Sequence, residues 1–369
     1  MASGKKTYSS TGVRYDILDP IKKLAQQQAL STSQNLFSFG MHEISQSRGE
    51  SAYVWDEGDS YRALVIEGLG TKNLIADEME RITGKTYYDA IAKDTVAMIV
   101  NDLIVVGARP QVVNAYFGVG DSAWFHDTKR AGALINGFAA AVNEARAVWG
   151  GGETPALKGI VEKDAIDLSG SAVGIIRPKE RLTLGDKITE GDAVFLVESN
   201  GVHANGMTLV RSLAQNLKNG YLTKLPDGKS FGEALLSPTH IYAGLINDLF
   251  EAGVGIHYMV NVTGHGWRKI MRAHKEVSYV MDHVPNPLPV FSFIQEHSGN
   301  DDREMYGNFN MGAGFAIIMP DQFVSQATHI AWKNYHMSAG KAGSVQKGSK
   351  KVVIQPVGVE FGTETLDIR

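Results

Sequence analysis

One short segment of the sequence combines residue types that can bind the phosphates of a nucleotide. Residues 67–72 read EGLGTK and follow directly on an apolar run that is typical of a strand. Glycines at a strand end let backbone N–H groups face phosphate oxygens, Glu67 can hold a magnesium ion, and Lys72 can neutralise phosphate charge. The GxxxxGK spacing of a Walker loop is absent. An ordinary surface turn is the alternative interpretation of this segment.

A second polar group lies within a predicted helix over Tyr87 to Val106, whose apolar residues recur with helical spacing. Asp94 and Asn101 share one face of this helix and lie roughly 10 Å apart along its axis. They are too far apart to grip one ion, but they could line one phosphate channel. Asp102 is rotated about 80° from Asp94 and lies near the edge of that face. A solvent-facing polar stripe is the alternative, although polar groups among such apolar neighbours need partners.

Three glycine-bearing turns carry further polar side chains. Residues 150–154 read GGGET, and Glu153 could bind a metal ion or a substrate amine, or belong to a charged loop after a helix end. Residues 199–206 (SNGVHANG) and 263–266 (TGHG) each lie between a predicted strand and a predicted helix. Free N–H groups at a helix start can hold a phosphate monoester. His203 could contribute a proton or a hydrogen bond, although a histidine in a turn is more often structural.

Composition favours a two-domain protein that acts on a small molecule. The chain has 369 residues, 43% of them hydrophobic, and single cores rarely grow beyond about 250 to 300 residues. The formal net charge is −4, and no long run of like charges indicates a nucleic-acid or membrane surface. The chain has no cysteine, which excludes disulfides and thiolate chemistry. No signal peptide or membrane span is recognisable, so we expect a cytoplasmic protein.

The predicted elements interleave strands and helices without the regular alternation of a doubly wound sheet, which indicates the α/β (α+β) class. The basic and acidic stretch 177–191 reads as a surface connection, and we place a domain boundary near Pro178. We expect a flexible, exposed loop over 338–351. Strands are predicted at 62–66, 112–119, 170–176, 193–197, 312–318 and 352–355, and helices at 20–29, 131–149 and 207–217, with a strand, turn and helix over 258–271.

Taken together, the ordered motifs resemble the AIR synthetase (phosphoribosylformylglycinamidine cyclo-ligase) family over nearly the whole chain. The family's D-G-V-G-T-K stands here as residues 67–72, with Glu67 in place of the aspartate. In the TGHG turn, His265 stands where the family commonly has glycine. The other matching blocks are 8–16, 94–103, 107–110, 151–154, 199–206, 236–242, 263–266 and 304–312.

This resemblance implies a fold and a reaction. Residues 1–178 would form an ATP-binding and dimerisation domain, whose β-sheet completes a barrel across a homodimer. Residues 179–369 would form an α/β sandwich that binds substrate. The implied reaction is the ATP-dependent cyclisation of formylglycinamidine ribonucleotide to aminoimidazole ribonucleotide, ADP and phosphate, in purine biosynthesis. ATP and Mg²⁺ are the implied cofactors. Neither a nucleic acid nor a membrane is expected as a partner.

The resemblance also assigns roles to residues. It implies Glu67, Asp94 and Asp102 at the metal, and Lys72, Glu153 and His203 in catalysis. The ATP-binding set is Gly68, Gly70, Thr71, Lys72, Asp94 and Asn101, and the substrate-binding set is Ser199, Asn205, Gly206, Thr263 and Gly264. The alternative function is a nucleotide-binding paralogue without turnover that serves as a regulatory or scaffold subunit.

Overall fold

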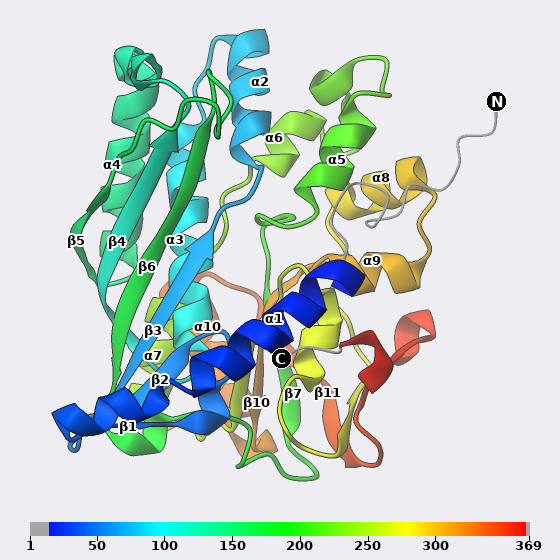
Figure 1. The fold of residues 1–369 in the computed structure, drawn as a ribbon. Coiled ribbons are helices and arrows are strands. Elements are labelled where there is room, and N and C mark those ends of the chain that lie inside the picture. Colours follow the sequence, from blue (N-terminus) through cyan, green and yellow to red (C-terminus); the bar gives the residue numbers. More distant parts are fainter. Residues whose placement is uncertain (1–14, 367–369) are drawn as a thin grey trace.

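A computed structural model describes residues 15–366 as two sheets flanked by helices (Figure 1). The opening block predicted from Tyr8 lies, up to Arg14, outside the described residues. Helix α1 (Tyr15–Leu30) crosses in front of the C-terminal half in this view. The α/β class predicted from the sequence is confirmed. In the described part of the chain, no helix combines the length and the apolar character that a membrane span requires.

The N-terminal half is built on a six-stranded sheet in the order β1-β2-β3-β6-β4-β5. All neighbours pair antiparallel except β4 and β5, which are parallel. Helices α2, α3 and α4 lie behind this sheet in Figure 1, so one of its faces is covered. The strands are β1 (His42–Glu43), β2 (Tyr53–Asp56), β3 (Tyr61–Gly68), β4 (Arg109–Val119), β5 (Val148–Glu153) and β6 (Ile166–Ile176), and the helices are α2 (Asn73–Thr83), α3 (Tyr88–Ile104) and α4 (Thr128–Glu144).

The C-terminal half is built on a seven-stranded sheet in the order β13-β12-β9-β11-β7-β10-β8. Every residue of β8 and β10 is buried, because helices and neighbouring strands cover them. The strands are β7 (Ala193–Glu198), β8 (Tyr258–Asn261), β9 (Val277–Met281), β10 (Ala313–Met319), β11 (Ala339–Lys347), β12 (Lys351–Ile354) and β13 (Val359–Gly362). The helices are α5 (Met207–Ala214), α6 (Phe231–Leu235), α7 (Ala243–Glu251), α8 (Pro289–Ser298), α9 (Asp302–Asn308) and α10 (Val324–Tyr335).

Two glycine-rich segments differ from the sequence prediction. The stretch 338–351, expected to be a flexible loop, contains β11, which lies between β9 and β7 inside the sheet. A Cβ on Gly343 would come within 1.9 Å of the Val280 carbonyl oxygen, so glycine there permits close backbone pairing. The helix predicted to reach Trp149 ends at Glu144, and GGGE belongs to the edge strand β5. After TGHG, the predicted helix is a 3₁₀ helix over Gly266–Met271.

Helix α3 belongs to the cores of both halves. Its residues are buried on nearly every side, from Tyr88 to Ile104. It packs on β3, β4 and β6 in its own half and reaches α7 and β8 of the other half. A helix with no solvent-facing stripe must bury its polar side chains as well, and these therefore need partners.

Candidate functional site

A cavity of about 340 Å³ lies where the two halves of the chain meet. The end of β3, helix α3, the turn before α5 and the TGHG turn after β8 all contribute to its wall. It brings together many of the residues predicted from separate motifs, namely Glu67, Gly68, Gly70, Asp102, Asn205, Thr263 and Gly264. The remaining lining residues are Lys22, Leu69, Met98, Ala204, His265, Lys269 and Arg272.

Two carboxyl groups face each other in this cavity. Glu67 lies near the end of β3, and Asp102 lies in the last turn of α3. Burial, the nearby charge of Asp102 and the hydrogen bond between the two groups together raise the pKa of Glu67 to about 8, although the charges of Lys269 and Arg272 act in the opposite direction. The Nδ2 of Asn261 donates a 2.6 Å hydrogen bond to Asp102 Oδ1 and fixes that carboxylate. The pair therefore carries closely spaced negative charge when both groups are ionised.

A lysine that the motifs did not single out lies in the same cavity. Lys269 is 3% exposed, and its Nζ donates a 2.7 Å hydrogen bond to the hydroxyl of Thr263. Burial lowers the pKa of Lys269 to about 8, while Asp102 and Glu67 act in the opposite direction. Burial and the neighbouring cations lower the pKa of His265 to about 3, so this ring is neutral. The basic run WRKIMR after TGHG was the available signal for Lys269.

The cavity suits a magnesium-bound phosphate chain. Mg²⁺ is usually held by one or two carboxylates together with substrate phosphates, which matches the donor set of Glu67 and Asp102. Gly70 has a φ of +75°, a conformation that favours glycine and exposes backbone at the cavity wall. The Nδ2 of Asn205 is buried without a hydrogen-bond partner and belongs to a residue that lines the cavity. A ligand with phosphate or carbonyl oxygens would satisfy it.

Three predicted nucleotide-binding residues, Lys72, Asp94 and Asn101, lie behind this cavity instead of lining it. Lys72 and Asp94 are both 0% exposed and form an ion pair at 2.7 Å. Lys72 Nζ also donates to the carbonyl oxygen of Ser237, at 3.0 Å. The backbone N–H and the hydroxyl of Thr239 both donate to Asp94 Oδ1. The carboxylate of Asp94 is thus engaged by protein groups, and in this structure it does not face the cavity as a metal ligand would.

Asn101 repeats the same kind of contact two turns farther along α3. Its Nδ2 donates to the carbonyl oxygen of His240 at 2.8 Å, and its Oδ1 accepts from the backbone N–H of Tyr242 at 3.0 Å. Asp94 and Asn101 are about 10 Å apart along the helix, and three extended residues from Thr239 to Tyr242 span a similar length. We call this set of contacts, from Lys72, Asp94 and Asn101 to residues 237–242, the interdomain clasp.

His203 lies beside the clasp. It is 1% exposed and adopts a left-handed backbone conformation, with φ at +57°. Burial, together with the charges of His240 and Lys72, lowers its pKa well below the ordinary value, so the ring is neutral. Its Nε2 is buried without a hydrogen-bond partner. A neutral imidazole of this kind can give or accept one hydrogen bond from a substrate that reaches it.

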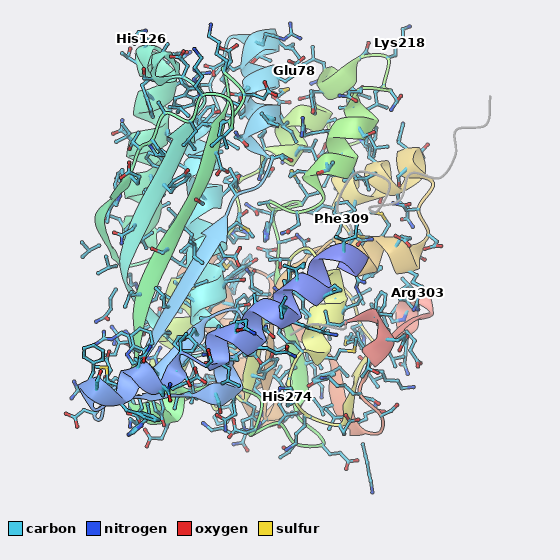
Figure 2. The ribbon with its side chains drawn as sticks, in the orientation of Figure 1. Glu78, His126, Lys218, His274, Arg303 and Phe309 are labelled. Atoms are coloured by element: carbon cyan, nitrogen blue, oxygen red, sulfur yellow. The ribbon has the colours of Figure 1, made fainter. Side chains whose placement is uncertain are left out.

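The remaining predicted residues are distributed around the site. The hydroxyl of Ser199 donates to Asn310 Oδ1 at 2.7 Å, so it supports its own turn. In Figure 2 the labelled Phe309 belongs to the C-terminal half, and a Cβ on Gly206 would lie 2.2 Å from its ring. Thr71 follows Gly70 directly but does not line the cavity. Glu153 is exposed on β5, three positions from β3 across the sheet, and is not brought to this cavity within one chain.

Comparisons with known proteins agree on one family. Residues 49–176 match the family model described as AIR synthase related protein, N-terminal domain, and residues 189–355 match its C-terminal counterpart. The phosphoribosylformylglycinamidine cyclo-ligase of Methanothermobacter thermautotrophicus is 34% identical, over 89% of this chain and 92% of that protein. The enzyme of the same name from Methanosarcina barkeri is 32% identical, over 89% and 93%.

A solved structure shares the fold at lower identity. AaThiL complexed with AMPPCP and TMP superimposes with a TM-score of 0.59 at 15% identity, and covers 98% of each chain. This likeness concerns the architecture of both halves and does not extend to the substrate.

Removing one partner of the clasp should destabilise the protein. Lys72→Met leaves the Asp94 carboxylate buried without its counter-ion, and we expect a loss of about 3–5 kcal/mol in the free energy of unfolding. Urea denaturation followed by circular dichroism measures it. Lys93→Met is the matched control: Lys93 pairs with the partly exposed Glu144, and we expect a loss of less than about 1 kcal/mol. Equal stability of the two variants would contradict the interdomain clasp.

The raised pKa of Glu67 should make stability depend on pH. The folded value of about 8 lies above the ordinary value of 4.5, so the folded protein retains a proton that the unfolded chain loses. Wild-type stability should therefore fall, relative to Glu67→Gln, as pH rises from 5 to 8. Urea unfolding at pH 5, 6.5 and 8 measures the difference.

A carboxylate with the opposite shift provides the control. The side-chain hydrogen bond from Arg62 lowers the pKa of Glu57, so Glu57→Gln should be less stable than wild type at all three pH values. A Glu67→Gln advantage that stays constant from pH 5 to 8 would show that this carboxyl is ionised throughout, against the expected shift.

Proposed function

The chain belongs to the AIR synthase family, and we propose that it catalyses the ATP-dependent cyclisation of formylglycinamidine ribonucleotide to aminoimidazole ribonucleotide. The observation that carries this proposal is the cavity that joins the EGLGTK, VNDL, HANG and TGHG motifs, in a chain 34% identical to a phosphoribosylformylglycinamidine cyclo-ligase over most of its length. ATP is the second substrate, and the products are ADP and phosphate.

The chemistry requires an amide oxygen to become a leaving group. Transfer of the γ-phosphoryl group from ATP to that oxygen achieves this, and attack by the amidine nitrogen then closes the ring and expels phosphate. Charge neutralisation and positioning are the main contributions that a protein makes to such a transfer. When bound, Mg²⁺ would neutralise charge on the transferring phosphates.

We assign roles to the cavity residues on this basis. Glu67 and Asp102 would hold Mg²⁺, and the backbone at Gly68 and Gly70 would approach the phosphates. The basic side chains of Lys22, Lys269 and Arg272, which line the same cavity, would offset the charge of the phosphates. Asn205 would donate its buried N–H to the substrate. Lys72, Asp94 and Asn101 would act indirectly, by holding the wall of the cavity in place.

Purified protein provides the direct test. With ATP and formylglycinamidine ribonucleotide we expect aminoimidazole ribonucleotide and ADP in equal amounts, and no ADP when the ribonucleotide is omitted. Asp102→Asn should lower kcat/KM by about 100-fold or more, because one carboxylate of the proposed metal site is lost. Nucleotide binding without product under all conditions would favour the regulatory or scaffold alternative. An Asp102→Asn variant with wild-type turnover would remove Asp102 from the site.

We propose in addition that two chains pair through the uncovered face of the N-terminal sheet. Leu64, Val173, Val112 and Val148 are cross-strand neighbours on β3, β6, β4 and β5, and they form one apolar row. Three of these residues are 41%, 37% and 63% exposed (Leu64, Val112 and Val148), and Ile66 on β3 is 78% exposed. An apolar row of this kind on a sheet is typical of a surface that another protein covers.

A charge placed on this uncovered face of the sheet, at Ile66 beside the apolar row, should separate the two chains. We expect Ile66→Glu to convert a dimer into a monomer in size-exclusion chromatography with light scattering, because the carboxylate would be buried in the apolar contact. Leu222→Glu is the control: Leu222 is 43% exposed in the C-terminal half and should leave the mass unchanged. A wild-type monomer, or an Ile66→Glu dimer, would refute the proposed interface.

A further inference from the structure

A buried lysine beside two carboxyl groups is more than a magnesium site requires. Lys269 comes from the 3₁₀ helix Gly266–Met271 of the C-terminal half, while Glu67 and Asp102 come from the N-terminal half. Lys269 is as buried as the hydrophobic core, and its Nζ donates a hydrogen bond to the hydroxyl of Thr263. A charged ammonium group in such a place needs negative charge nearby. Glu67 and Asp102 supply it.

The carboxyl pair has the complementary requirement. Two carboxyl groups that share a hydrogen bond in a buried site cannot both ionise without positive charge close by. Among the described residues, no third His, Asp or Glu joins them to make a metal-binding cluster of protein ligands alone. A divalent cation held only by this pair would therefore depend on oxygens from a ligand. In a chain without nucleotide, the positive charges of Lys269 and Arg272 act on Glu67.

We propose that Lys269 is a built-in cation of this site, which balances Glu67 and Asp102 and restricts metal binding to the nucleotide-loaded state. With the ammonium in place, a divalent cation that enters alone must displace the proton held by Glu67, and it meets a like charge beside it. A nucleotide changes this balance, because its phosphates bring several negative charges and further oxygen ligands. The metal ion and the nucleotide then enter together.

Thr263 has a positioning role in this proposal. Its hydroxyl accepts the hydrogen bond that holds the ammonium, and it lies in the same turn as Gly264 and His265, at the cavity wall. The TGHG motif thus fixes Lys269 against the carboxyl pair of the other half. The inference rests on the proposed function only in treating Glu67 and Asp102 as metal ligands, and its test measures metal binding without turnover.

The affinity of the nucleotide-free protein for Mn²⁺, used as a probe for Mg²⁺, tests the proposal. Isothermal titration and the decrease of the free Mn²⁺ signal in electron paramagnetic resonance both measure it. We expect weak binding by the wild type. Lys269→Gln removes the charge and keeps a group that can donate to Thr263, and we expect it to bind Mn²⁺ at least tenfold more tightly. Lys269→Met should show the same gain, and Lys269→Arg should stay within about threefold of wild type.

A double variant connects the gain to the carboxyl pair. Adding Asp102→Asn to Lys269→Gln should abolish the gain, because one of the two carboxylates is lost. An unchanged or weaker Mn²⁺ affinity in both Lys269→Gln and Lys269→Met would overturn the proposal. Tight Mn²⁺ binding by the nucleotide-free wild type would overturn it as well. This measurement uses only the wild-type protein, so it does not depend on whether a variant folds. Because none of these experiments requires turnover, a failed cyclisation assay would leave their outcome interpretable.

Discussion

The structure depends on the burial of polar side chains along α3 and on the partners that satisfy them. Asp94 and Asn101 lie among apolar neighbours and have no access to water, so each must find its hydrogen bonds within the protein. The partners belong to residues 237–242 of the other half. Separating the halves would expose a desolvated ion pair and several unpaired groups at once. The relative position of the two halves is therefore fixed by polar contacts at the junction, in addition to apolar packing.

The cavity follows from this fixed position. Its carboxyl pair comes from β3 and α3, and its buried ammonium group comes from the 3₁₀ helix Gly266–Met271 that follows β8. Asn261, at the end of β8, donates to Asp102 and adds a polar contact across the junction at the cavity itself. A site assembled from two halves needs its parts held within a fraction of an ångström for phosphoryl transfer. The interdomain clasp provides that constraint without occupying the cavity, so residues of one helix serve two purposes.

Sequence periodicity predicted the helices and strands that are strongly apolar. It failed for strands that form because of their pairing with neighbouring strands and not because of their own composition. The strands around Val65 and Val194 and the helix α3 have clear apolar patterns and were predicted in place. Strand β11 reads AGKAGSVQK, and β5 reads VWGGGE. Small residues in these strands permit close approach to β9 and β4. Such an approach depends on the neighbouring strand, so it cannot be recognised from one segment of sequence alone. Local composition therefore indicated a loop and a turn.

The motifs of the candidate site could be predicted from the sequence. Which of their residues line the cavity, and which hold the two halves together, could not. Helical spacing correctly placed Asp94 and Asn101 on one face, yet it contains no information on what that face meets. The residue next to Asn101, Asp102, points to the cavity because about 100° of helical rotation separates the two side chains. Lys269 was missed because a single lysine in a basic run is normally a surface residue. Its significance arises only when folding places it against two carboxyl groups from a segment more than 150 residues away in the sequence, where charge balance becomes a constraint on what else can bind.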